Sequence, residues 1–246
     1  MEFLMNMQTI FLNNINGFFR GTFYTILISL IGTFIGLFIG MVIGIVRTIP
    51  KSKNRGLNIL LIIVKTLMNI YVQVLRGTPM IVQATLFYYG LQQFANIDLS
   101  SLNAACIVVS INTGAYMAEV VRGGIISIDD GQFEAASALG MNHVQTMVNI
   151  VLPQAFRNII PAIGNEFIIN IKDTSVLNVI SVNELFFLTK SIAGGNYMYF
   201  ETYLITSMIY LILTLSIASI LHYVEKRIEG PENYDKNKVN VLKSTN

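Results

Sequence analysis

Several absences narrow what this chain of 246 residues can do. Tryptophan is missing, charged residues make up only 12% of the sequence, and the single cysteine is Cys106. One cysteine excludes an internal disulfide framework. Without tryptophan, any aromatic belt at a membrane surface must consist of tyrosine and phenylalanine. The low charge, together with 53% hydrophobic residues, excludes most soluble domains and is typical of an integral membrane protein.

The usual motifs of nucleotide, metal and hydrolase sites are also absent from the sequence. The dipeptide Gly-Lys does not occur, so the chain contains no P-loop. Its two histidines, His143 and His222, lie far apart and do not form a zinc ligand set with one cysteine. There is no G-x-S-x-G elbow either. We therefore expect no catalytic, metal-binding or cofactor-binding residues in this chain, and any energy for transport must enter through another subunit.

Long apolar runs are present instead. A helix of roughly 20 mostly apolar residues crosses a bilayer core of about 30 Å, and five segments meet this requirement, at about 22–46, 57–94, 103–121, 159–182 and 203–223. The first 20 residues lack the features of a cleavable signal peptide, so we expect a retained, partly amphipathic lead-in. The sequence thus predicts an all-α integral membrane protein with a single domain over 1–246, an ordered core at about 17–228 and a polar cytoplasmic tail at 229–246.

Segment 57–94 is too long for one straight span, and the run RGTP at 76–79 should break it. Lysine and arginine are concentrated in 47–55 and after the fifth span, whereas the connection 95–102 contains neither. A single crossing by 57–94 places both basic regions on the cytoplasmic side, as the positive-inside rule requires, and two crossings do not. We therefore predict five transmembrane helices, with the N-terminus outside and the C-terminus inside.

One cytoplasmic stretch, EAASALGMNHVQT at 134–146, has the pattern of a helix, a glycine and a second helix. An aspartate at 129–130 is suited to cap the first helix, Gly140 to end it in the left-handed conformation, and Asn142 to cap the second helix. Apolar residues then recur at helical spacing up to Pro153, which we expect to stop that helix. The stretch is either an amphipathic cap lying on the bilayer or a docking element for a cytoplasmic partner.

The spacing of this stretch resembles the EAA loop of permease subunits of ABC importers. It contains Glu134-Ala135-Ala136, three residues, Gly140, nine residues, Ile150, one residue, and Leu152-Pro153. Three flanking segments resemble the polar amino-acid uptake family of these permeases: RGTPMIVQ at 76–83, GAYMAEVVRGGI at 114–125 and LPQAFRNIIPAIGNEFIINIKDTSVL at 152–177. The resemblance covers about residues 17–228.

The resemblance implies a type I ABC importer permease fold in the cell membrane, with a cytoplasmic coupling loop at 129–153. The residues implied to dock on an ATPase are Glu134, Ala135, Ala136, Leu139 and Gly140. The implied partners are an ABC ATPase subunit dimer, a second permease subunit of the same or another kind, an extracytoplasmic amino-acid-binding protein, the lipid bilayer and a small amino-acid substrate. ATP and Mg would be bound by the ATPase, and nucleic acid is not among the partners.

Polar groups at or near membrane depth define a candidate substrate pathway, consisting of Arg76, Thr78, Asn165, Glu166, Asn170 and Asp173. Ionisable groups in a span normally face protein or a water-filled cavity. Glu166, Asn170 and Asp173 share one helical face at i, i+4 and i+7. A helix break also frees backbone groups that water or protein must satisfy. For each residue the alternative is a structural role, such as a plain kink at 76–79.

Four glycines recur every four residues in the first span, at Gly32, Gly36, Gly40 and Gly44. They form a smooth helix face that permits close packing of another helix. Packing within the subunit is the favoured interpretation, and contact with a second subunit is the alternative.

The leading functional hypothesis is the permease subunit of an ATP-driven amino-acid importer. The alternatives are a secondary transporter or channel that needs no ATPase, and a membrane scaffold or sensor whose loop binds a signalling partner. The sequence shows no inverted repeat of the kind that many secondary transporters contain.

Overall fold

The structure, a computed structural model, describes residues 1–52 and 54–229, and all regular structure in this part of the chain is helical. Of the predicted tail at 229–246, residues 230–246 lie outside the described residues. The helices are α1 (Glu2–Asn13), α2 (Ile15–Thr48), α3 (Arg55–Gly77), α4 (Met80–Ala95), α5 (Ser101–Ile126), α6 (Asp130–Ala138), α7 (His143–Thr146), the π-helical turn η1 (Met147–Val151), α8 (Leu152–Asp173), the 3-10 segment η2 (Thr174–Ile180), α9 (Leu185–Asn196) and α10 (Tyr199–Glu229).

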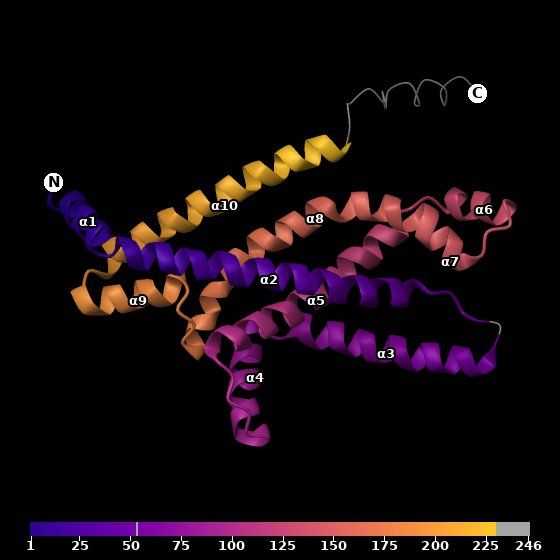
Figure 1. The fold of residues 1–246 in the computed structure, drawn as a ribbon, viewed down its shortest axis with the longest axis horizontal. Coiled ribbons are helices and arrows are strands. Elements are labelled where there is room, and N and C mark those ends of the chain that lie inside the picture. The colour runs from indigo at the N-terminus through magenta and orange to yellow at the C-terminus, as the bar shows by residue number, and fades with distance from the viewer. Residues whose placement is uncertain (53, 230–246) are drawn as a thin grey trace.

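The long helices run roughly along one axis of the molecule, and α4 runs across it (Figure 1). Helices α2, α5 and α10 point in one direction, whereas α3 and α8 return in the other (Figure 1). Helices α1 and α9 lie at one end of the axis, and α6 and α7 lie at the opposite end (Figure 1). The two ends of the molecule are therefore built from different segments.

The centre of the fold is the contact between α2 and α5, which depends on the glycines of α2. A Cβ atom added at Gly32 would lie 2.3 Å from Val109 Cγ1, and one at Gly40 would lie 2.3 Å from Met117 Cβ. A Cβ atom added at Gly36 would lie 2.7 Å from Thr113 Cβ, and one added at Gly44 would lie 2.7 Å from Val121 Cβ. The favoured interpretation of the glycine stripe, packing within the subunit, is confirmed.

The partners on α5 also follow one another at intervals of four residues, in the same order as the glycines. The two helices therefore lie side by side in the same direction. A parallel α2 and α5 require one net crossing by the segment between them, which is what the charge pattern predicts for 57–94. The predicted break in that segment is confirmed, because α3 ends at Gly77 and α4 begins at Met80.

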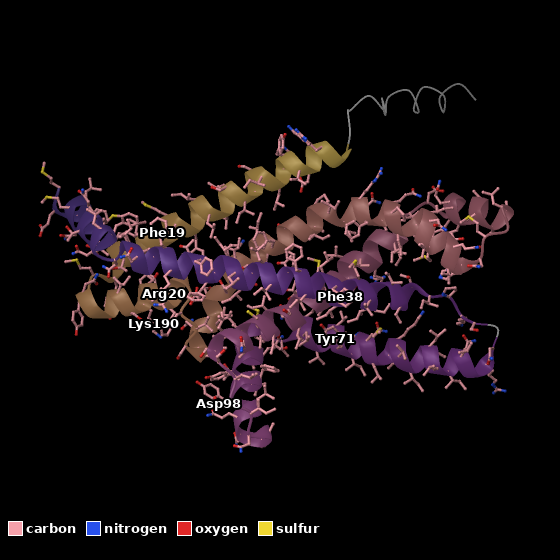
Figure 2. The ribbon with its side chains drawn as sticks, in the orientation of Figure 1. Phe19, Arg20, Phe38, Tyr71, Asp98 and Lys190 are labelled. Atoms are coloured by element: carbon pink, nitrogen blue, oxygen red, sulfur yellow. The ribbon has the colours of Figure 1, made fainter. Side chains whose placement is uncertain are left out.

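Four described helices, α2, α3, α5 and α10, are long and apolar enough to cross a membrane. A fifth crossing is obtained if the stretch His143–Ile180 and helix α9, which meet at a 56° bend, form one span. Apolar side chains such as Phe19 and Phe38 point outward from α2 (Figure 2), and each is more than half exposed. Such surfaces suit contact with lipid.

The expectation that Pro153 stops the second loop helix is wrong. The chain stays helical from His143 through η1 into α8, and Pro153 occupies the second position of α8. Proline is tolerated in the first turn of a helix because its missing N–H is not needed there. The π-helical turn before it interrupts the α-helical ladder at this point. The helical segment that contains the fourth predicted span therefore begins inside the loop, at His143, before residue 159.

Candidate functional site

The predicted coupling element, α6 and α7 with the glycine between them, has a cap at each joint. Asp129 Oδ1 accepts a hydrogen bond from the Gly131 N–H at 2.8 Å and so caps α6. At the end of α6, Gly140 has φ +75°, the left-handed conformation that was predicted for it. The Met141 N–H donates to the Ala136 carbonyl oxygen, and the Gly140 N–H donates to that of Ser137. This pair of bonds is the Schellman arrangement that ends a helix sharply.

The start of α7 carries the capping box expected from Asn142. Asn142 Oδ1 accepts from the Gln145 N–H at 3.0 Å, and Gln145 Oε1 accepts from the Asn142 N–H at 2.9 Å. Because both helix ends are satisfied from within the element, its shape does not depend on a partner.

The predicted coupling residues divide into an outward and an inward group. Glu134, Ala135, Leu139 and Gly140 are exposed, and Leu139 is 80% exposed. Ala136 is fully buried and faces the rest of the subunit. The outward group belongs to a small-sided, partly apolar surface at the tip of the molecule, which also includes the exposed side chains of Val144 and Val148.

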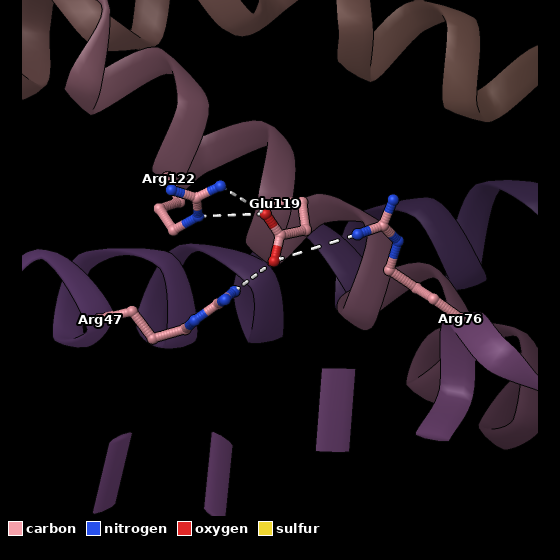
Figure 3. A network of polar contacts seen from close by, with 4 residues as sticks. All are labelled: Arg47, Arg76, Glu119 and Arg122. Atoms are coloured by element: carbon pink, nitrogen blue, oxygen red, sulfur yellow. Dashed lines mark hydrogen bonds and ion pairs between the residues drawn. The ribbon is translucent and has the colours of Figure 1, made fainter. Parts of the chain in front are cut away.

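Four charged residues form one cluster where α2, α3 and α5 meet (Figure 3). Glu119 Oε1 accepts from Arg47 at 2.7 Å, and Glu119 Oε2 accepts from the Nε and one Nη atom of Arg122 at 3.0 and 2.9 Å. Arg76 lies 4.0 Å from Glu119 Oε1 and places its guanidinium group 5.4 Å from the centre of the Tyr116 ring. The pair between Glu119 and Arg122 follows from their spacing, whereas the arginines of α2 and α3 come from distant segments.

The break between α3 and α4 presents Arg76 and Thr78 at the surface of the subunit, and both are exposed. The Thr78 hydroxyl donates to the Val74 carbonyl oxygen at 2.8 Å, which satisfies one acceptor at the end of α3. The Gln83 side chain reaches back to this break from α4. The break is therefore a fixed structure with its own hydrogen bonds.

The exposed side of α8 is polar although the helix belongs to a candidate span. Asn165, Lys172 and Asp173 are exposed on α8, and Glu166 is 9% exposed. Glu166 and Asp173 are separated by two turns on one face of α8. Three predicted pathway residues, Asn165, Glu166 and Asp173, therefore share the neighbourhood at this part of α8.

Asn170 lies on the same face of α8 as Glu166, and its side chain packs in the core. Its Nδ2 donates to Thr33 Oγ1 at 2.9 Å, and its Oδ1 accepts from Thr113 Oγ1 at 3.0 Å. Only 3% of Asn170 is exposed. The residue therefore joins α8 to α2 and α5, and both polar atoms of its side-chain amide form these hydrogen bonds.

Sequence reasoning missed three polar residues at these sites, namely Arg47, Gln83 and Asn112. Asn112 Nδ2 donates to Gln83 Oε1 at 2.9 Å, across the interface between α5 and α4. The signal for Gln83 was present, because it lies four residues after Pro79 and can reach the turn that the proline interrupts.

Among the described residues no group of acidic, histidine or cysteine side chains is arranged to hold a metal ion.

The fold, with four to five candidate spans among the described residues, is that of a multi-pass membrane protein. Residues 60–230 match the family described as "Binding-protein-dependent transport system inner membrane component". The chain belongs to this family, and the relatives it matches are permease proteins of amino-acid ABC transporters.

Individual relatives and structures support this assignment. The chain is 41% identical to the probable amino-acid permease protein YxeN of Bacillus subtilis (strain 168), over 67% of this chain and 75% of YxeN. It is 38% identical to the glutamine transport system permease protein GlnP of Escherichia coli (strain K12), over 65% and 74% of the two chains.

Among solved structures, an amino acid ABC transporter crystallised with histidines superposes with a TM-score of 0.78 at 34% identity, over 88% of this chain and 96% of that one. The MetNI methionine ABC transporter in an inward-facing conformation shares the fold, with a TM-score of 0.69 at 17% identity over 85% and 94% of the chains.

Proposed function

We propose that this chain is the membrane-spanning subunit of an ATP-driven amino-acid importer, and that two permease subunits enclose the translocation pathway. The observation that carries the proposal is the polar exposed side of α8. A charged side chain facing lipid at the centre of a span is costly, by about 2.5–3.5 kcal/mol on insertion scales. Lys172, Asp173 and Asn165 therefore need a wet pathway or a second subunit beside them.

The substrate chemistry fits the charges in this neighbourhood. An amino acid carries an ammonium and a carboxylate group, and the Arg76, Glu166 and Asp173 side chains offer one cationic and two acidic partners. Two relatives are named as permease proteins of glutamine and arginine transport systems, and both of these substrates are amino acids. We propose that Arg76, Thr78, Asn165, Glu166 and Asp173 line the pathway, and that the side chain of Asn170 supports it from behind.

The coupling step is assigned to the element formed by α6 and α7. Its outward surface, with Glu134, Ala135, Leu139 and Gly140, is proposed to dock on one subunit of an ATPase dimer that binds ATP and Mg. Its rigid caps make it suited to transmit movement, because force on a frayed loop would be lost in local bending. An extracytoplasmic amino-acid-binding protein would deliver substrate at the opposite end.

The orientation follows from the basic residues. The end of α2, the start of α3 and the pair α6–α7 lie at one end of the molecule (Figure 1), and Arg47, Lys51 and Arg55 flank that end. By the positive-inside rule this end is cytoplasmic, which gives five crossings with the N-terminus outside and the C-terminus inside. A cysteine introduced at Ile97 should then react with an impermeant reagent from outside, and one at Asn142 only from inside. The reverse pattern would remove the basis for the coupling assignment.

The deciding experiment is reconstitution. The chain would be co-expressed with a candidate ABC ATPase from the same organism, purified through a tag on the permease, and placed in liposomes. Uptake of radiolabelled amino acids that requires ATP and a copurifying ATPase would support the proposal. Uptake driven by an ion gradient without any ATPase would favour a secondary transporter, and an ATPase-free complex without uptake would favour a scaffold.

A further inference from the structure

The break between α3 and α4 leaves a backbone acceptor that proline cannot satisfy. In a continuous α-helix, the N–H of residue 79 would donate to the carbonyl oxygen of Leu75. Pro79 has no N–H. Gln83 Nε2 donates to that oxygen instead, at 2.8 Å, so the side chain supplies the donor that the proline lacks.

The same amide nitrogen also reaches the residue before the proline. It lies 3.0 Å from the Thr78 carbonyl oxygen and 2.8 Å from Thr78 Oγ1. One side chain therefore contacts the last turn of α3 and the irregular residue that follows it. Since Thr78 is a proposed pathway residue, the position of Gln83 bears directly on the pathway.

The other end of the Gln83 amide is fixed by α5. Its Oε1 accepts from Asn112 Nδ2 at 2.9 Å, and Asn112 is buried against the centre of the fold. The orientation of the amide is determined by this pairing, with its carbonyl toward the asparagine donor and its NH2 group toward the oxygens of the break. The break is thus joined to α5, the helix that α2 holds through its glycines.

We propose that Gln83 and Asn112 are positioning residues that hold the α3–α4 break, and with it Arg76 and Thr78, in place along the translocation pathway. This proposal rests on the proposed function, because the location of Arg76 and Thr78 matters for transport only if these two residues line the pathway. The Arg76 side chain has only long contacts with α5, 4.0 Å to Glu119 and 5.4 Å to the centre of the Tyr116 ring. The backbone at the end of α3 therefore also determines where the guanidinium group lies, and Gln83 holds that backbone.

Three substitutions separate this role from simple packing. Gln83→Met keeps the length of the side chain and removes both polar groups. Asn112→Leu removes the donor on α5 and keeps the volume. Gln92→Met is the matched control, because Gln92 is an exposed glutamine further along the same helix.

The first measurement needs no substrate. Spin labels at the exposed positions Phe94 on α4 and Ile126 at the end of α5, in a Cys106→Ser background, report the distance between the two helices in the assembled complex. We expect Gln83→Met and Asn112→Leu to broaden the distance distribution, and Gln92→Met to leave it unchanged. An unchanged distance distribution in both Gln83→Met and Asn112→Leu would overturn the proposal.

The second measurement is ATP-dependent uptake of a radiolabelled mixture of the 20 amino acids into proteoliposomes. Gln83→Met and Asn112→Leu should each lower the initial rate of uptake on the order of tenfold, the factor expected from one lost buried hydrogen bond. Assembly with the ATPase and basal ATP hydrolysis should stay at the wild-type level. The double variant should be no slower than Gln83→Met alone, because Asn112 acts on the break only through Gln83.

Multiplicative losses in the double variant, or a loss that only parallels reduced assembly, would contradict a shared positioning role. Normal uptake by Gln83→Met would contradict it as well. Failure of the proposed function gives a different result. The wild-type complex would then show no ATP-dependent uptake, while the distance measurement would still decide whether Gln83 and Asn112 hold the break.

Discussion

Substitution of Gly140 tests whether the coupling element works through its shape. The residue has φ +75°, and a Cβ added there would meet nothing within 4 Å. The cost of another residue is therefore backbone strain and not a clash within the subunit. Placing an ordinary L-residue in the left-handed conformation costs roughly 1–2 kcal/mol, and a β-branched residue is a stronger outlier.

This cost sets the expected effect on binding. If Gly140→Val relaxes to another backbone conformation in the free permease, the cost of restoring the docking shape is paid on association. Since about 1.4 kcal/mol corresponds to a factor of ten, the affinity for the ATPase should fall roughly 5- to 30-fold. Gly140→Asn is the matched control, because asparagine tolerates the left-handed conformation, and it should lose much less.

The assay is pull-down of purified ATPase by detergent-solubilised permease over a range of ATPase concentrations, followed by substrate-stimulated ATP hydrolysis in the reconstituted complex. Far-ultraviolet circular dichroism shows whether each variant keeps its helices. A Gly140→Val permease that binds and couples as well as Gly140→Asn would refute the reasoning. Glu134→Lys should have the smaller effect, because a single exposed charge is screened by salt.

Three further predictions concern the membrane region. Gly40→Val should destabilise the protein by about 1–3 kcal/mol or more through overpacking against α5, which would lower the unfolding temperature in detergent. Gly90→Ala should not, because a Cβ added at Gly90 meets nothing within 4 Å. Equal stability of the two variants would argue against tight α2–α5 packing. Asn170→Leu should cost about 1–3 kcal/mol, because it leaves hydroxyl groups of α2 and α5 without their partner, and an unchanged unfolding temperature would show that those bonds contribute nothing. Glu166→Gln should lower uptake or alter substrate preference while assembly persists, and wild-type uptake of every amino acid would remove Glu166 from the pathway.

Much of the fold could be predicted because hydrophobic length and charge placement act locally. The spans, the break at 76–79 and the caps at Asp129, Gly140 and Asn142 each depend on residues close together in sequence. The glycine stripe predicted a close contact, but not that α5 would supply it. Spacing on one helix says nothing about which other helix fills the face.

Other features depended on distant contacts and were missed. Helix α9 was not predicted, because it has only 12 residues and its N-cap, Glu184, is recognisable only beside its partners. Glu184 is fully buried and accepts hydrogen bonds from two backbone N–H groups and from Tyr210. Asn170 shares a helical face with Glu166, yet its side-chain amide pairs with hydroxyl groups of α2 and α5. The periodicity of α8 alone does not reveal this pairing.

The continuity of α7, η1 and α8 has a mechanical consequence. At a rise of about 1.5 Å per residue, the helical path from His143 to Glu166 is roughly 35 Å long. If this path tilts as one rod about its far end, a rotation of about 5° displaces the near end by about 3 Å, the diameter of a water molecule. About 6 Å beyond that pivot, where Asn170 pairs with α2 and α5, the same rotation moves atoms by less than about 1 Å. A displacement of α7 at one end of the molecule is therefore compatible, on geometric grounds, with unchanged packing around Asn170.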